Sequence, residues 1–154
     1  MAATVDRRPL RLSATEMAAW VGLLRAHSVV TRRLDRELEA ECGLSLAQYD
    51  VLVQLERAPE RRLRMTELAE QVVLSRSGLT RLVDRLVAMG LVERSYCPSD
   101  ARGVYAGLTP DGRGRLAEAA VVHMRGVREH VTGKLAVAQQ RALADATGQL
   151  LADR

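Results

Sequence analysis

The sequence predicts a mainly α-helical fold, in which six helices are interrupted once by a two-stranded β-hairpin. Aromatic residues make up only 3% of the 154 residues and Phe is absent, so the core has to be built from Leu, Val, Ala and Met. Such a core favours helices packed on helices. Apolar residues recur at helical spacing through most of the chain, and strand-like composition is confined to the stretch between Gly90 and Thr109.

The first helix is expected to be long and to begin after a short basic arm, residues 1–12. Ser13 and Glu16 have the spacing of a capping box, and Gly43 is placed to end the helix. A helix of this length cannot easily bury its apolar stripe within one small chain, so the stripe predicts a partner chain. The residues of the stripe are Met17, Trp20, Leu24, His27, Leu34 and Leu38.

Three shorter helices are predicted next. The first begins at Ser45, where Gln48 completes a second capping box, and it ends before Pro59. A polar connector then leads to a short helix over about 65–72. A tight turn separates this helix from the next one, which covers about 75–89.

Two strands and two further helices complete the predicted order. The segments LVERSYC and VYAGLT are rich in Val, Leu and Tyr, and PSDAR between them has the residues of a turn. Thr109 and Pro110 provide a cap and a first helical residue for a helix that reaches Gly133. A last helix is expected over about 135–151.

The charge balance favours a nucleic acid partner but does not prove one. The net charge is +4, from 23 basic and 19 acidic residues, and Lys134 is the only lysine. Arginine suits contacts to phosphates and base edges better than lysine does. A genome rich in G and C would produce the same excess of arginine, so the placement of the arginines has to decide.

The sequence also limits where the protein acts. No apolar run is long enough to cross a membrane, and residues 1–20 lack the apolar stretch of a secretory signal. Two cysteines are too few for a disulfide framework. We therefore expect a cytoplasmic protein without a membrane partner.

Residues 63–109 combine a short helix, a tight turn and a second helix, the arrangement of a helix-turn-helix. Ala69 is a small residue where the two helices should cross. The outward face of the second helix carries hydroxyls and arginines, which suit phosphates and base edges in a DNA major groove. The alternative is that these side chains only solvate a surface helix. They are Ser75, Arg76, Ser77, Thr80, Arg81, Asp84 and Arg85.

The hairpin that follows is predicted to have a basic tip, formed by Arg94 and Arg102. A basic finger beside a groove-reading helix can enter the adjacent minor groove. Asp100 stands two residues before Arg102 and can hold its guanidinium through a charge-assisted hydrogen bond. The combination of helix pair and hairpin in one short run favours DNA binding over a merely solvated surface.

The segment MTELAEQVVLSRSGLTRLVDRLVAMGLVER and the following DARGVYAGLTPDG resemble the MarR family of bacterial transcriptional regulators. The flanking helices match that family in order and length. The resemblance implies a winged helix within an intertwined homodimer, with residues 13–44 and 110–154 as dimerisation region and 45–109 as DNA-binding lobe. The second motif is carried by Asp100, Arg102, Leu108, Thr109 and Gly112.

The resemblance also implies how DNA is read. Arg102 would read the minor groove, although Ala101 leaves this hairpin with less positive charge than many family members have. Two recognition helices about 34–36 Å apart require a pseudo-palindromic operator in double-stranded DNA. Repression, on the nucleoid, is the expected outcome by analogy with the family. The residues implied to read the major groove are Ser75, Arg76, Ser77, Thr80 and Arg81.

Members of the family commonly change their DNA affinity when a small molecule binds between the dimer helices and the DNA-binding lobe. The expected effector is a small aromatic or phenolic compound, and the candidate ligand-binding residues are Trp20, His27, Tyr49 and Met124. The alternative is that these are ordinary core residues. One subgroup responds to urate, and Asp50 and Arg94 match two of its polar positions. Leu82 replaces a third, an arginine, so urate is not expected.

A thiol switch is the alternative regulatory hypothesis. Cys97 lies in the hairpin near Arg94 and Arg102, and nearby cations activate a thiol. Cys42 lies at the far end of the first helix. No metal site is predicted, because His123 and His130 are too far apart for a chelating pair.

Two further functional classes remain. We expect neither a cofactor nor an enzyme activity, since no Ser-His-Asp set, phosphate-binding Gly loop or carboxylate pair is recognisable. A helical dimer that uses its helix-turn-helix to bind protein is the other possibility.

Overall fold

The computed structural model describes residues 11–72, 76–97 and 100–152. In this part of the chain, six α-helices and three strands confirm the mainly α-helical prediction. Two short 3₁₀ helices, Pro59–Arg61 and Thr132–Lys134, join longer elements. The α-helices are α1 (Ala14–Cys42), α2 (Leu46–Arg57), α3 (Met65–Gln71), α4 (Arg76–Ala88), α5 (Pro110–His130) and α6 (Val137–Leu151). The strands are β1 (Arg62–Arg64), β2 (Val92–Cys97) and β3 (Asp100–Leu108).

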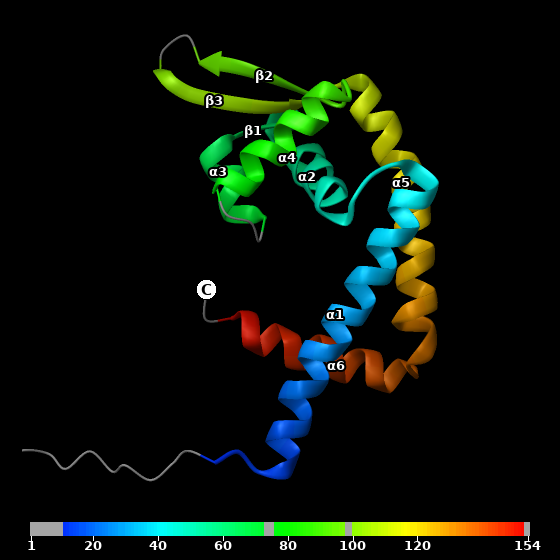
Figure 1. Cartoon of the computed structure of the whole chain (residues 1–154). Helices are drawn as coiled ribbons and strands as arrows, with labels where there is room; N and C mark the ends of the chain where they lie inside the picture. Colours follow the sequence, from blue (N-terminus) through cyan, green and yellow to red (C-terminus); the bar gives the residue numbers. More distant parts are fainter. Residues whose placement is uncertain (1–10, 73–75, 98–99, 153–154) are drawn as a thin grey trace, which may run out of the picture.

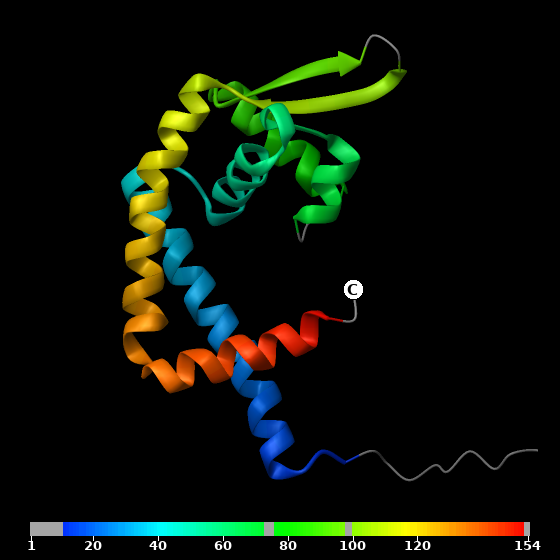
Figure 2. The same ribbon diagram turned by 180° about the vertical axis from the view of Figure 1, so that it is seen from behind.

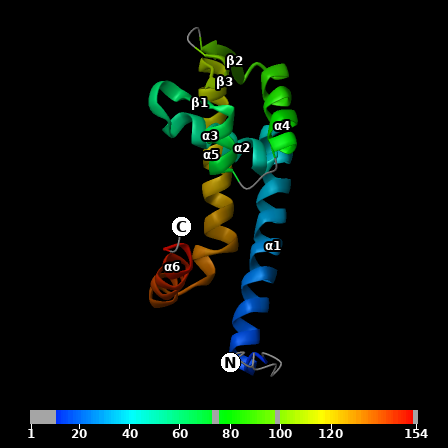
Figure 3. The same cartoon turned by 90° about the vertical axis from the view of Figure 1, so that its left-hand side faces the viewer.

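The molecule consists of a lobe, formed by α2, α3, α4 and the sheet, and a helical arm, formed by α1, α5 and α6. Figures 1 and 2 show α2, α3, α4 and the sheet gathered into the lobe at one end of α1 and α5. Helices α1 and α5 pack against each other and run away from the lobe. The view from the side shows α6 leaving the far end of α5 to one side of this pair (Figure 3).

The helix ends form as the sequence predicts. The Ser13 hydroxyl accepts from the Glu16 amide at 3.2 Å, and the Glu16 carboxylate accepts from the Ser13 amide at 2.7 Å. Ser45 and Gln48 repeat this capping box at the start of α2. Gly43 ends α1 with φ of 65°, a left-handed conformation that favours glycine.

The sheet contains one strand that the sequence analysis missed. The hairpin of β2 and β3 is confirmed, and β1 pairs with the other side of β3, so the antiparallel order is β1-β3-β2. Strand β1 is only three residues long and buries only Leu63. An alternation of apolar and polar residues this short cannot be distinguished from a polar connector in the sequence. Ala106 of β3 pairs with Leu63 of β1 on one edge and with Arg94 of β2 on the other.

The core lies almost wholly in the lobe and where the lobe meets α1 and α5. In α1, Leu34 and Leu38 are buried, but Met17, Trp20 and Leu24 of the same stripe are exposed. Helix α6 has no buried residue. None of the helices in the described residues is both long and apolar enough to cross a membrane. The fully buried large side chains are Leu38, Leu44, Leu52, Leu55, Leu68, Leu79, Leu86, Val51, Val83 and Val92.

Candidate nucleic-acid interface and adjoining cavity

Helix α4 presents one buried face and one exposed face. Its apolar residues Leu79, Leu82, Val83 and Leu86 are at most 3% exposed and face the lobe core. The opposite row of side chains, which includes residues of the predicted major-groove set, faces solvent. Those residues are Thr80, Arg81, Asp84 and Arg85.

Helix α3 packs beside α4, as a helix-turn-helix requires. Leu68 and Val72 enter the core, and the small Ala69 packs against it. Ser75 lies outside the described residues, and the side chains of Arg76 and Ser77 do as well.

The hairpin of β2 and β3 projects beyond the helices of the lobe (Figure 1). The backbone of Asp100 and Arg102 lies in β3, and that of Cys97 ends β2. The side chains of these three residues lie outside the described part of the structure. Their predicted roles therefore stay predictions.

Arg94 does not lie at the tip of the hairpin, contrary to the sequence analysis. It is the third residue of β2 and pairs in register with Ala106, near the base of the hairpin. Its Nη2 is 2.8 Å from Oδ1 of Asp84 on α4. The prediction failed because it grouped the charges of the whole hairpin as its tip, although Arg94 lies four residues before the turn predicted at PSDAR.

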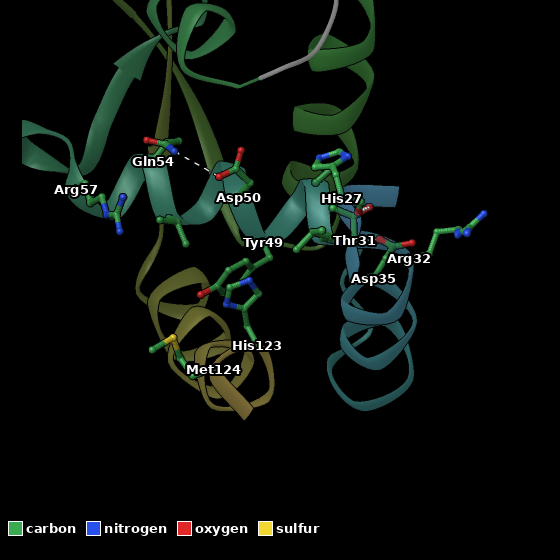
Figure 4. A pocket seen from close by; sticks show the side chains of 13 residues that line it. His27, Thr31, Arg32, Asp35, Tyr49, Asp50, Gln54, Arg57, His123 and Met124 are labelled. Atoms are coloured by element: carbon green, nitrogen blue, oxygen red, sulfur yellow. Dashed lines mark hydrogen bonds between the residues drawn. The ribbon is translucent and has the colours of Figure 1, made fainter. Parts of the chain in front are cut away.

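A cavity of about 730 Å³ lies between α1, α2 and α5 (Figure 4). Three predicted ligand-binding residues line it: His27, Tyr49 and Met124. Trp20 does not. It lines a separate apolar cavity of about 550 Å³ between α1 and α6, together with residues such as Leu23 and Leu143.

Sequence reasoning named Asp50 only as a match to a urate-responsive subgroup, and it missed most of the other polar residues that line the first cavity. Asp50, Gln54 and Arg57 all line it from α2. Their spacing of four and three residues places them on one helical face, a signal that could have been read from the sequence. Gln54 Nε2 donates to Asp50 Oδ1 at 3.3 Å, which is the dashed line in Figure 4.

Tyr49 and His123 form the aromatic wall of this cavity. Their rings stack with centroids 4.6 Å apart and an interplanar angle of 26°. Burial lowers the pKa of His123, an effect that the Asp50 carboxylate partly opposes. Burial also raises the pKa of the Tyr49 hydroxyl. The Nδ1 atom of His123 is buried and has no hydrogen-bond partner among the described residues.

His123 and His130 serve separate contacts rather than a common site. His130 Nε2 is 2.5 Å from Glu37 Oε1, which ties α5 to α1. Within the described residues no group of three or more His, Cys, Asp or Glu side chains could hold a metal ion. Cys42 is buried, and burial raises the pKa of its thiol.

Comparison with known proteins decides the family. A model of the MarR family matches residues 43–103. The crystal structure of Sco3205 from Streptomyces coelicolor, a MarR family transcriptional regulator in complex with DNA, is 37% identical in sequence. The match covers 94% of this chain and 91% of the Sco3205 chain, with a TM-score of 0.86. The chain belongs to the MarR family.

Two other relatives support this assignment. The MarR family regulator AbsC, also from Streptomyces coelicolor, is 32% identical over 92% of this chain and 95% of its own, with a TM-score of 0.84. The transcriptional repressor YetL of Bacillus subtilis is 30% identical over 92 residues, 58% of this chain and 55% of YetL. This chain therefore spans about half the length of the curated relative.

Proposed function

We propose that this MarR family protein is a sequence-specific regulator that binds double-stranded DNA, with α4 in the major groove and the hairpin in the adjacent minor groove. The observations that carry the proposal are the solvent-facing row of α4, which contains Thr80, Arg81 and Arg85, and the hairpin that projects from the same lobe (Figure 1). Arginine and hydroxyl side chains on such a helix suit base edges and phosphates. The DNA complex of Sco3205 supports the same use of the shared fold.

The active species in this proposal is a homodimer that acts on nucleoid DNA in the cytoplasm. Residues 13–44 and 110–154 form its dimerisation region, and 45–109 form its DNA-binding lobe. The support is the exposed apolar surface of α1 and α6, where Trp20, Leu24 and Leu143 are each at least 45% exposed. Two-fold symmetry then sets a pseudo-palindromic operator with half-sites about one helical turn apart.

The cavity between α1, α2 and α5 is the proposed effector site, and its ligand is a small aromatic or phenolic compound. The stacked Tyr49 and His123 rings offer a flat aromatic wall, and Met124 adds apolar surface. The cavity lies between α1 and α5 of the helical arm and α2 of the lobe, so an occupant can change the angle between the arm and the lobe. We infer repression that the effector relieves, and the name of the relative YetL as a repressor supports this direction.

DNA binding is tested first, by selecting duplexes from a random-sequence library with the wild-type protein. Mobility shifts then compare a selected duplex with unselected DNA across a salt series. We expect tight binding of the selected duplex, with affinity that falls steeply with salt because phosphate contacts release counterions.

Two variants of α4 make this test specific. Arg81→Ala and Arg85→Ala should each weaken binding by roughly five- to hundredfold, the range for a lost base or phosphate contact. Arg128→Ala makes the same charge change on an exposed site of α5 and should leave binding nearly unchanged. Equal, weak binding of all sequences by the wild type would overturn the proposal and favour a protein adaptor.

A further inference from the structure

The DNA-facing row of α4 contains one acidic residue, Asp84, with the basic residues Arg81 and Arg85 beside it. A carboxylate on such a surface repels the phosphates of DNA, so its presence needs an explanation. The structure supplies one, since Asp84 Oδ1 is 2.8 Å from Arg94 Nη2 on β2. The ion pair neutralises the carboxylate and joins the helix to the hairpin.

The surroundings of Arg94 allow it to fix the hairpin relative to α4. Its side chain is 27% exposed, and its backbone sits in the β2–β3 ladder opposite the fully buried Ala106. Nε and Nη2 of Arg94 are both buried and have no hydrogen-bond partner among the described residues, so the contact of Nη2 with Asp84 is an ion pair that supplies the guanidinium with a counter-charge. The Asp84 side chain is 59% exposed, so the cost of separating the pair falls on the more buried guanidinium of Arg94, which would lose its counter-charge.

The pair lies where the hairpin leaves the lobe. Two residues beyond Arg94, Tyr96 is 70% exposed, and Figure 1 shows the rest of the hairpin extending past the helices. A contact at the base of a projecting hairpin controls the direction of its far end. A change in angle at this point displaces the far end more than the base.

We propose that Asp84 and Arg94 are positioning residues that fix the angle between α4 and the hairpin, so that both grooves of one half-site are engaged together. This inference rests on the proposed DNA-binding function and adds the coupling between its two reading elements. Asp84 acts through Arg94 and does not contact the DNA bases.

The proposal predicts the opposite sign from simple electrostatics. Asp84→Asn removes one negative charge from each DNA-facing surface, so electrostatics alone predicts tighter binding to every sequence. The positioning role predicts weaker binding to the selected duplex, because the hairpin loses its fixed direction. Binding to unselected DNA should stay equal or increase.

The experiment measures affinity and hydroxyl-radical footprints of full-length variants on a duplex selected by the wild type. For Asp84→Asn we expect a roughly three- to thirtyfold loss of affinity for the selected duplex, in the range of coupled neighbouring residues. We also expect loss of the outer, minor-groove protection with the major-groove protection retained. The retained protection shows in the same lane that the lobe is folded.

Four further variants separate coupling from charge. Arg94→Gln should lose the same outer protection, and the double variant Asp84→Asn with Arg94→Gln should lose no more than either single one. Glu70→Gln makes the same charge change on an exposed site of α3 and should keep both protections. Should Asp84→Asn fail to fold, Arg94→Lys keeps the charge without the planar guanidinium and should lose part of the outer protection.

Two results would overturn the inference. In one, Asp84→Asn binds selected and unselected DNA more tightly and keeps both protections, which makes Asp84 a purely electrostatic residue. In the other, the losses in the two single variants add up in the double variant. A wild-type protein that selects no sequence and leaves no footprint instead refutes the proposed function itself.

Discussion

His123 illustrates how much a single side chain depends on its tertiary surroundings. In the sequence it is one of three histidines, and its spacing from His130 does not fit a metal site. In the structure it stacks on Tyr49, a residue of a different helix, and lines the proposed effector cavity. The contact joins residues 49 and 123, and no local pattern in the sequence reports a pairing over that separation.

The burial of His123 predicts how stability depends on pH. Burial lowers its pKa in the folded chain below the ordinary value of 6.5, so near pH 6 the unfolded chain binds more protons than the folded one. The free energy of unfolding should therefore decrease as the pH falls through about 6.5 toward the folded pKa, and the His123 contribution should be complete above about pH 7.

The variant His123→Phe keeps a ring against Tyr49 and removes the titration. Urea unfolding at fixed protein concentration, from pH 7.5 to 5, should show a flatter pH dependence for this variant than for the wild type. Parallel curves for the two proteins would mean that His123 does not contribute to the pH dependence.

At the scale of elements, the joint between α4, β3 and α5 depends on one glycine. A Cβ placed on Gly112 would lie 2.1 Å from the Leu91 carbonyl oxygen and 2.7 Å from Leu108 Cδ1. The first neighbour is backbone and cannot move aside cheaply. The absence of a side chain at Gly112 therefore lets the first turn of α5 approach the segment that leads from α4 into the hairpin.

Gly112→Ala should accordingly destabilise the protein by about 1–3 kcal/mol, the usual cost of forcing an extra group into a packed site. Gly114→Ala is the matched control, two residues further along α5, where a Cβ would have nothing within 4 Å. It should be neutral or more stable by up to about 1 kcal/mol, because alanine favours helix over glycine. Equal effects of the two substitutions in denaturant unfolding would contradict the packing argument.

The elements that sequence reasoning predicted are those with local signals. Both capping boxes and the start of α5 at Thr109 and Pro110 follow from residue types at fixed spacing, and the structure contains all three. Strand β1 escaped because its backbone pairs with β3, more than 40 residues later, and only Leu63 is buried. Local chemistry fixes helix ends, whereas a three-residue edge strand exists only through its partner.

The same division explains which positions of the candidate site could be placed from the sequence. Thr80, Arg81 and Arg85 follow from helical periodicity, because Leu79, Leu82 and Leu86 must face the core. The place of Arg94 required the strand register, and the cavity required the packing of α1, α2 and α5. The exposed face of one helix is readable from the sequence, whereas a surface or cavity assembled from several elements is not.

At the scale of the whole molecule, the distribution of apolar surface is uneven. The lobe has a closed core, whereas the far parts of α1 and α6 expose large apolar side chains and enclose an apolar cavity of about 550 Å³. Exposed apolar surface of this extent marks an interaction site in a protein of this kind. A second copy is the proposed partner because a dimer places two α4 helices on one DNA duplex.

This proposal is tested with Leu24→Asp and Leu143→Asp, which place a charge on that surface at residues 48% and 45% exposed in the single chain. Neither substitution disturbs the lobe core, so each variant should stay folded. We expect sedimentation velocity to show a monomer, because a carboxylate buried in an apolar interface without a partner is strongly unfavourable. Affinity for a selected duplex should fall by at least about a hundredfold, because one lobe reads only half of the operator.

The control is Val87→Asp, which adds the same charge at a residue 37% exposed on the lobe. It should remain dimeric, since the lobe lies outside the proposed dimerisation region. A monomeric Leu24→Asp that kept wild-type DNA affinity would show that one lobe suffices. A dimeric Leu143→Asp would show that α6 lies outside the interface. Loss of dimer and DNA affinity together in both variants, with Val87→Asp still dimeric, is the result that the uneven apolar surface predicts.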